Sequence, residues 1–179
     1  MAGRVHLVRH SEAVHNTDHD FSHVVGLIVT SPLRRTIQTT LLAFANVLDE
    51  RYFDKGSGKG IPGGAELVLD PDLQERSALP CDTGSDPRVL EATFPSLDFS
   101  GLGLYSPDAV EDRVRKVRQY LADKIEALKD RNRREIVVFL SGDPEIDLPK
   151  AGWRSYSIEQ GEEGSVVLVS VEPKDSKLA

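Results

Sequence analysis

The sequence predicts an α/β protein, a three-layer α/β/α sandwich with a mostly parallel central sheet. Short apolar runs rich in valine and isoleucine recur along the chain, without the polar alternation of a sheet that has one face in water. Helical patterns lie between some of these runs, as in a sheet covered by helices on both faces. The length of 179 residues suits one domain with a sizeable core. We expect that domain to span residues 1–172, with a flexible tail over 173–179.

The apolar runs are the predicted strands. Each is short and nearly free of charged residues, as expected of strands buried on both faces. They cover residues 5–8, 27–30, 67–69, 136–140 and 166–171. Because ligands in open α/β sheets bind outside the carboxyl ends of the strands, residues that directly follow these runs are candidates for a site.

Two helices are predicted. The clearer one runs from about Pro107 to Asp130, and Ser106 before Pro107 is a good N-terminal signal. Its apolar residues recur at steps of three and four, and are Val110, Val114, Val117, Leu121, Ile125 and Leu128. The second helix begins near Pro32, with Ser31 as a cap. Its apolar stripe consists of Leu33, Ile37, Leu41, Phe44 and Leu48.

A glycine-rich stretch, "DKGSGKGIPGG" at residues 54–64, raises the question of a nucleotide-binding loop. Backbone amides in such loops can cradle phosphates. This one lacks the Gly-Lys-Ser/Thr ending that would hold magnesium, and it does not pass directly from a strand into a helix. The stretch therefore predicts a flexible surface loop.

The charge and the cysteine content limit the class of partner. A formal net charge of −7 does not favour binding to nucleic acid or to an acidic membrane. An anionic ligand would therefore need a local basic pocket. The single cysteine, Cys81, cannot form an internal disulfide, and there is no N-terminal apolar stretch of signal-peptide or transmembrane length. We expect a cytoplasmic protein. The sequence does not indicate an oligomeric state.

The first candidate site residues are Arg9 and His10, where the first apolar run stops. Adjacent side chains on a strand point to opposite faces, so both can reach one ligand only if the chain leaves strand geometry at Arg9. A loop that begins there satisfies this condition. The alternative is a surface pair that merely closes the strand.

"VTSPLRRTIQTT", residues 29–40, repeats this arrangement at the second strand. Arg34 and Arg35 fall in the first turn of the predicted helix. A helix N-terminus attracts anions, whereas arginines there oppose the helix dipole unless an anion lies between them. A phosphate would supply that anion. Solvated charge on a helix end is the alternative, and periodicity does not say which arginine points inward.

Four stretches together resemble the histidine phosphatase superfamily, also called phosphoglycerate mutase-like, and most closely its fungal members. "LVRHSEAVHN" is similar to the family's Arg-His-Gly motif with a following asparagine, and "SPLRRTIQT" to its Ser-Pro-Leu-x-Arg-x-x-Gln-Thr motif. "LQERSALPCDTGSD" resembles its acidic loop. "EIVVFLSG" resembles the strand that ends in Thr-His-Gly.

The resemblance implies a role for each matching residue. His10 would be the nucleophile that becomes phosphohistidine, and Glu75 the general acid. Arg9, Arg35 and Asn16 would bind the phosphoryl group, which suits the bidentate fork of arginine. Nearby positive charge would keep the imidazole neutral and nucleophilic. No metal and no cofactor are implied.

The chain departs from this pattern in two ways. Ser141 stands where the family has its second histidine, and would still line the phosphate site. A serine donates one hydrogen bond without charge, so catalysis would weaken by roughly 10²–10³. Ser11 replaces the glycine after the nucleophile. Among the other histidines we expect His6 to be a core residue, and His15 falls beside Asn16. His19 and His23 are poor substitutes for the missing histidine.

The connection between the first two strands is also short. Only about ten residues separate Asn16 from Leu27, whereas a crossover between parallel strands usually takes a dozen or more. The segment that follows Ser141 is shorter than in the family as well.

These observations predict an enzyme, a phosphomonoesterase that acts through phosphohistidine on a small phosphorylated molecule. The alternative is a catalytically inactive protein that binds phosphate or a phosphoester. A phosphoglycerate mutase fits less well, because a mutase must shield its phosphoenzyme from water and this chain is short around the expected pocket.

Overall fold

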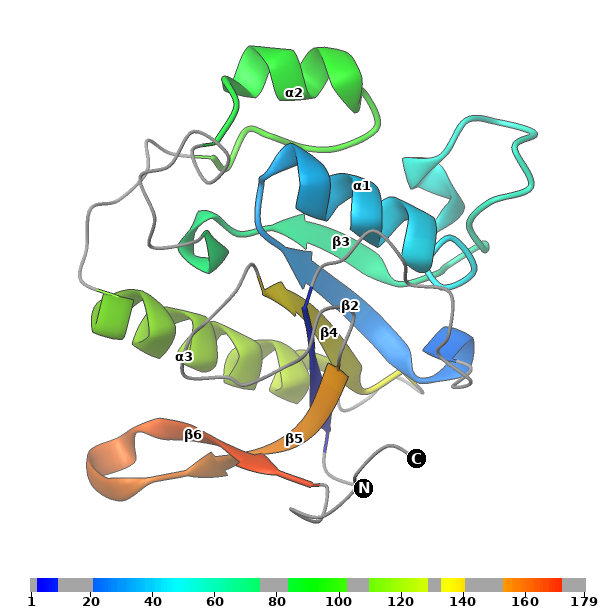
Figure 1. The fold of residues 1–179 in the computed structure, drawn as a ribbon. Helices are drawn as coiled ribbons and strands as arrows, with labels where there is room; N and C mark the ends of the chain where they lie inside the picture. Colours follow the sequence, from blue (N-terminus) through cyan, green and yellow to red (C-terminus); the bar gives the residue numbers. More distant parts are fainter. Residues whose placement is uncertain are drawn as a thin grey trace, which may run out of the picture.

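The computed structural model describes residues 3–9, 21–74, 84–102, 110–128, 133–140 and 153–171. Within them a six-stranded sheet is flanked by helices (Figure 1). The strands are β1 (Arg4–Arg9), β2 (Val25–Thr30), β3 (Glu66–Leu69), β4 (Glu135–Leu140), β5 (Trp153–Gln160) and β6 (Val166–Ser170). The helices are α1 (Arg34–Ala43), α2 (Pro87–Thr93) and α3 (Val110–Leu128). Single 3₁₀ turns are η1 (Phe21–His23), η2 (Glu50–Tyr52), η3 (Pro71–Leu73) and η4 (Glu162–Gly164).

The strand order is β3-β2-β4-β1-β5-β6. The first four strands of the chain are mutually parallel, whereas β5 runs antiparallel to β1 and β6 antiparallel to β5. The predicted mostly parallel sheet is therefore confirmed. β1 and β2 are not neighbours, because β4 lies between them. The connection between β1 and β2, residues 10–24, reaches across one strand, about 10 Å from axis to axis, and it exceeds the dozen residues that a crossover usually takes.

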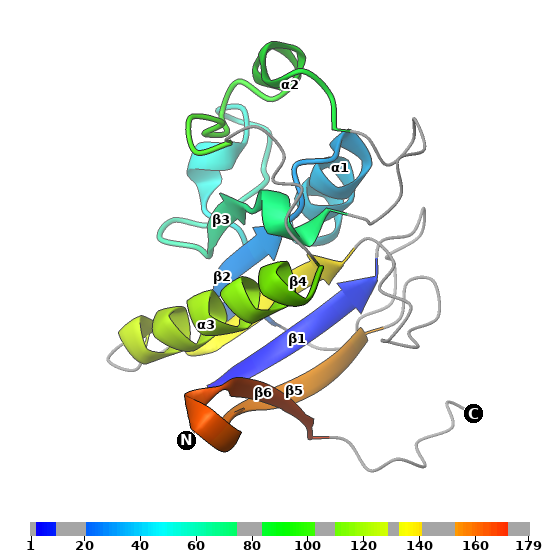
Figure 2. The same ribbon diagram turned by 90° about the vertical axis from the view of Figure 1, so that its left-hand side faces the viewer.

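Helices cover the two faces of the sheet separately, which confirms the three layers (Figure 2). On one face, α3 packs Leu121, Ile125 and Leu128 against Val5 of β1 and Ile136 of β4. On the other, the end of α1 lies over the sheet. The buried side chains there are Val8, Phe21, Val25, Ile28, Phe44, Val47, Leu48, Ala65, Leu67, Val137 and Phe139. α2 packs on α1 rather than on the sheet, through Leu90 and Ile37.

All the predicted strands are present, and the structure adds β5. This strand, "WRSYSIEQ", escaped prediction because it has a polar face and an apolar face rather than a continuous apolar run. Tyr156 and Ile158 pack on the α3 side of the sheet, whereas Ser155 bonds to His6. A parallel core strand would not tolerate such alternation, but an antiparallel strand near the edge does.

The helix predictions were correct in position and partly wrong in extent. α3 has the expected apolar stripe over its described residues, and the Ser106–Pro107 start lies outside them. α1 begins at Arg34, not Pro32. Leu33 is its N-cap residue without a side-chain cap, so the expected capping by Ser31 is wrong. Leu48 lies beyond the helix, in an isolated bridge to Ala65. α2, which Asp86 caps, was not predicted.

The glycine-rich stretch 54–64 is a loop between η2 and β3, and its residues 55–59 are exposed. Gly60 donates its amide hydrogen to the carbonyl oxygen of Ala45 and has a φ of +77°. A Cβ there would lie 2.4 Å from the Cα of Glu50, so only glycine fits. The loop does not lead into a helix, and the surface-loop prediction is confirmed. The predicted tail after Glu172 lies outside the described residues.

Among the described helices, none combines the length and the apolar character that a membrane crossing needs.

Candidate functional site

The candidate site lies at the carboxyl edge of the sheet, where β1, β4 and β2 end side by side. Arg9 of β1 is in register with Leu140 of β4, and Thr30 of β2 with Phe139. The parallel strands thus bring their last residues to one edge, as the sequence predicted. The structure describes the backbone of Arg9 but not its side chain. His10, Asn16, Glu75 and Ser141 lie outside the described residues.

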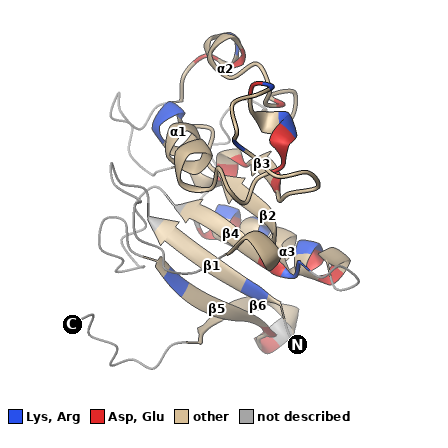
Figure 3. Ribbon diagram, turned by 90° about the vertical axis from the view of Figure 1, so that its right-hand side faces the viewer, with Lys and Arg blue, Asp and Glu red and all other residues tan. Residues whose placement is uncertain are grey.

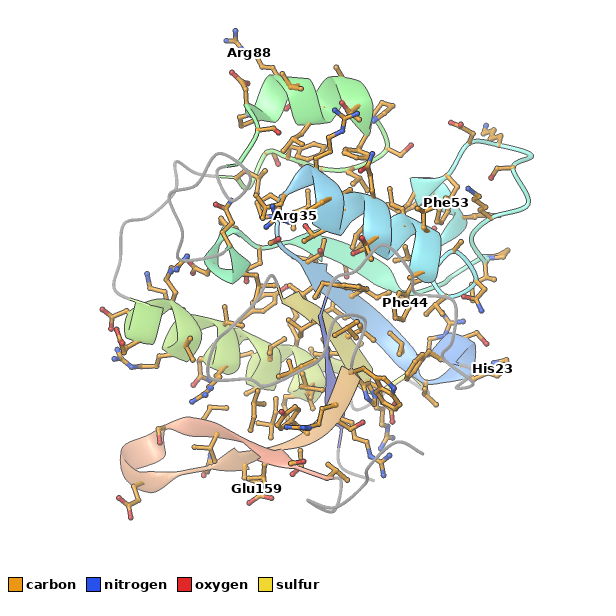
Figure 4. The ribbon with its side chains drawn as sticks, in the orientation of Figure 1. His23, Arg35, Phe44, Phe53, Arg88 and Glu159 are labelled. Atoms are coloured by element: carbon orange, nitrogen blue, oxygen red, sulfur yellow. The ribbon has the colours of Figure 1, made fainter. Side chains whose placement is uncertain are left out.

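α1 starts directly above this edge, and its first turn is basic (Figures 3 and 4). Arg35 is half-buried, whereas Arg34 is exposed. The helix has no acidic residue in its first turn and no side-chain cap. A helix N-terminus of this kind carries partial positive charge, which attracts anions. An anion can be held here by the amides and by Arg35 together.

Hydroxyl groups fix the turn that leads from β2 into α1. Thr36 Oγ1 lies 2.7 Å from the carbonyl oxygen of Ser31 and 2.8 Å from that of Leu33. It also lies 2.9 Å from Ser31 Oγ. Because Thr36 has one hydroxyl hydrogen, which these carbonyls accept, Ser31 donates to Thr36. Ser31 therefore closes the turn instead of capping the helix, and both side chains are fully buried.

Thr30, the last residue of β2, is a site candidate that the sequence analysis missed. Its side chain is fully buried, and its Oγ1 has no hydrogen-bond partner within the described part of the chain. A buried hydroxyl without a partner costs about 1–3 kcal/mol. The signal in the sequence was a threonine that ends an apolar strand just before Ser31, Pro32 and the two arginines. Thr30 thus places a hydroxyl group at the carboxyl edge of the sheet.

Charged groups also gather where β3 ends. Asp70 caps η3 by accepting from the amide of Asp72. Burial raises the pKa of the Asp70 carboxyl, and the charge of Asp72 raises it further, against the lowering effect of that hydrogen bond. Arg113 of α3 is 3% exposed and donates to the carbonyl oxygen of Gln74 at 3.3 Å. The sequence does not mark Arg113 as buried, because it lies outside the predicted apolar stripe of this helix. It is a buried cation beside the residue that precedes Glu75.

The described histidines lie away from this edge. His6 is 3% exposed in β1, and lies 2.9 Å from both Ser155 Oγ and Glu135 Oε2, which confirms that it is a core residue. The hydrogen bond from His6 lowers the pKa of Glu135, against the effect of burial, and the charges of His6 and Arg4 lower it further. His23 is exposed at the amino end of β2, far from Arg35 (Figure 4). It cannot replace a histidine at the carboxyl edge.

Among the residues that the structure describes, no group of three or more His, Cys, Asp or Glu side chains is placed to hold a metal ion. The basic start of α1 at the carboxyl edge suits an anion.

No family model matches the chain, and no curated protein matches it. Several solved structures are similar to this chain at low sequence identity. A mycobacterial hydrolase is 17% identical, with a TM-score of 0.48 over 97% of this chain and 94% of that one. A mycobacterial glucosyl-3-phosphoglycerate phosphatase is 16% identical, with a TM-score of 0.48 over 94% and 98%. A phosphoserine phosphatase from Entamoeba histolytica, solved with 3-phosphoglyceric acid, is 16% identical, with a TM-score of 0.45 over 96% and 98%.

Proposed function

We propose that this protein is a phosphomonoesterase that acts on a small phosphorylated molecule through a phosphohistidine at His10. The observation that carries the proposal is the start of α1. A half-buried Arg35, an uncapped helix N-terminus and the last residue of β1 meet at one edge of the sheet. The sequence places His10 directly after Arg9 at that edge. Positioning and charge neutralisation are what phosphoryl transfer needs most from a protein.

The reaction would proceed in two displacements. In the first, a neutral imidazole nitrogen of His10 attacks phosphorus, and the bond from phosphorus to the ester oxygen breaks. Glu75 gives its proton to the departing alkoxide. In the second, water attacks the phosphohistidine while Glu75 takes a proton from it, so that inorganic phosphate leaves and His10 is regenerated. Arg9, Arg35 and Asn16 would hold the oxygens of the phosphoryl group throughout.

Ser141 sets the rate in this proposal. A serine hydroxyl offers one hydrogen bond where the resembling family has a histidine, so turnover is slower by roughly 10²–10³ than with the full set of donors. Ser141→His should raise the turnover number with little change in phosphate affinity. Steady-state kinetics on p-nitrophenyl phosphate measures both quantities, because phosphate is a competitive product inhibitor.

The experiment that tests the proposal is the trapping of acid-labile phosphate on the protein during incubation with a ³²P-labelled phosphomonoester. We expect label on His10 and none on the His10→Ala variant, which should also lose turnover. His23→Ala is the matched control, since His23 is exposed at the other end of β2. Turnover that survives His10→Ala unchanged would exclude the mechanism.

A catalytically inactive phosphate binder is the second candidate, and the serine at position 141 is the observation that favours it. Calorimetric binding of inorganic phosphate without detectable turnover, followed by activity in Ser141→His, would support it. A mutase would instead exchange phosphate between phosphoglycerates.

A further inference from the structure

A hollow lies beside α1, between this helix and the turn that follows α2. Its volume is about 210 Å³, and three segments enclose it. These are α1 at Leu41, the segment from Tyr52 to Lys59, and the turn after α2 from Thr93 to Leu97. Pockets for drug-sized ligands measure about 300–1,000 Å³, so this one suits a smaller molecule. We call it the α1–α2 pocket.

Four apolar side chains, two of them aromatic, contribute to the lining of the α1–α2 pocket beside several polar ones. Leu41, Phe53, Phe94 and Leu97 line it, and all four are half-buried. Leu41 and Leu97 pack both against the buried cluster between α1 and the sheet and against the cluster between α1 and α2. The pocket therefore lies where these two clusters meet. The hydroxyl of Tyr52 is engaged elsewhere, as it accepts from the amide of Leu67.

The rim has one carboxylate and one ammonium group. Asp54 and Lys59 both line the α1–α2 pocket and are exposed. No ion pair or side-chain hydrogen bond joins either charge to any residue that the structure describes, including each other. The backbone between them is held by a turn in which Ser57 donates its amide hydrogen to the carbonyl oxygen of Asp54. Opposite charges are thus presented on one ordered turn beside the apolar side chains of the pocket.

We propose that the α1–α2 pocket binds a free α-amino acid with an apolar side chain, such as phenylalanine or leucine. The ammonium group of the ligand would face Asp54, its carboxylate would face Lys59, and its side chain would lie on Phe53, Phe94 and Leu41. A zwitterion satisfies both rim charges at once, which a simple anion or cation cannot do. A small pocket that combines apolar side chains with a few polar groups suits a ligand that has both kinds of surface.

This pocket is separate from the candidate phosphate site. Leu41 lies six residues after Arg35 on the same helix, which is about 9 Å along its axis. The two sites can therefore be tested independently, and the amino-acid proposal does not depend on phosphatase activity.

The test is a titration of ¹⁵N-labelled protein with L-phenylalanine, followed by amide shifts. We expect saturable shifts around Phe53 and over residues 93–97. Lys59→Gln and Asp54→Asn should each weaken binding by about 2- to 5-fold, because exposed ion pairs contribute up to about 1 kcal/mol each. Lys55→Gln is the matched control, since Lys55 is an exposed lysine of the same loop that does not line the pocket. Ser96→Trp, at an exposed rim position, should block binding without disturbing the core.

Ligand analogues separate the charges. 3-Phenylpropionate lacks the ammonium group, so its binding should be weaker than that of phenylalanine and insensitive to Asp54→Asn. Phenethylamine lacks the carboxylate and should be insensitive to Lys59→Gln. Absence of binding, equal affinity for all three compounds, or unchanged binding to Ser96→Trp would overturn the proposal.

Discussion

At the scale of single residues, the two neighbouring arginines of α1 differ in burial, and that difference predicts a difference in function. Arg35→Ala should weaken the binding of inorganic phosphate by about 10- to 100-fold, because a charge-assisted hydrogen bond contributes about 1.5–3 kcal/mol. Arg34→Ala, at the exposed position beside it, should change the affinity less than 3-fold. Isothermal titration calorimetry measures both, with urea unfolding as a check on the fold. Equal losses in the two variants would contradict the assignment of Arg35.

Thr30 makes a different prediction at the same scale. Valine has the shape of threonine without the hydroxyl, and the Thr30 hydroxyl is buried without a partner in the described residues. Thr30→Val should therefore raise the free energy of unfolding by about 1 kcal/mol. If that hydroxyl serves the anion, phosphate affinity should fall in the same variant. Urea denaturation in phosphate-free buffer measures the first effect. A destabilised variant would show that the hydroxyl already has a structural partner.

At the scale of elements, the turn between β2 and α1 should behave as one unit. Ser31→Ala and Thr36→Val should each lower the free energy of unfolding by about 1–2 kcal/mol, since each removes a partner from a buried hydrogen bond. The double variant should lose clearly less than the sum, because both single changes break the same bond. Thr39→Val on the same helix is the control, and its hydroxyl donates only to the carbonyl oxygen of Arg35. Additive losses in urea unfolding would argue against a shared bond.

The elements also show what could be predicted from sequence. Short apolar runs without polar alternation predicted five of the strands, β1 to β4 and β6. β5 was not predicted, because its Ser155 is a polar residue at a buried position. The hydrogen bond that accommodates Ser155 there is made with His6, which lies 149 residues away in the sequence. The predicted start of α1 was wrong because Ser31 followed by Pro32 is the usual sequence pattern of a helix N-cap. In the structure the hydroxyl group of Ser31 is hydrogen-bonded to Thr36 instead. Among the described residues of the candidate site, the sequence pointed to Arg35. It did not point to Thr30 and Arg113, because their burial results from packing between distant segments, which no local sequence pattern shows.

At the scale of the whole molecule, the strand order joins distant parts of the chain through one polar connection. Glu135 of β4, His6 of β1 and Ser155 of β5 lie on three consecutive strands of the sheet. They form a continuous chain of two 2.9 Å contacts. His6 also packs between Phe21 and Trp153, with ring centroids at 5.3 and 5.7 Å. This polar chain ties the antiparallel β5 to the parallel part of the sheet.

That connection predicts a dependence of stability on pH. The pKa of Glu135 is lowered in the folded protein, chiefly by the hydrogen bond with His6. A carboxyl group of this kind stabilises the fold above its unfolded pKa of 4.5, and the contribution is lost as the pH falls from there through the lower folded pKa.

Glu135→Gln should therefore cost about 1 kcal/mol of unfolding free energy at pH 7, and progressively less below pH 4.5. Glu91→Gln, at an exposed position of α2, should cost close to nothing at any pH. Urea unfolding of the three proteins between pH 3 and pH 7 measures these differences. A penalty for Glu135→Gln that stays constant over this range would mean that the ionised carboxylate does not hold the strands together.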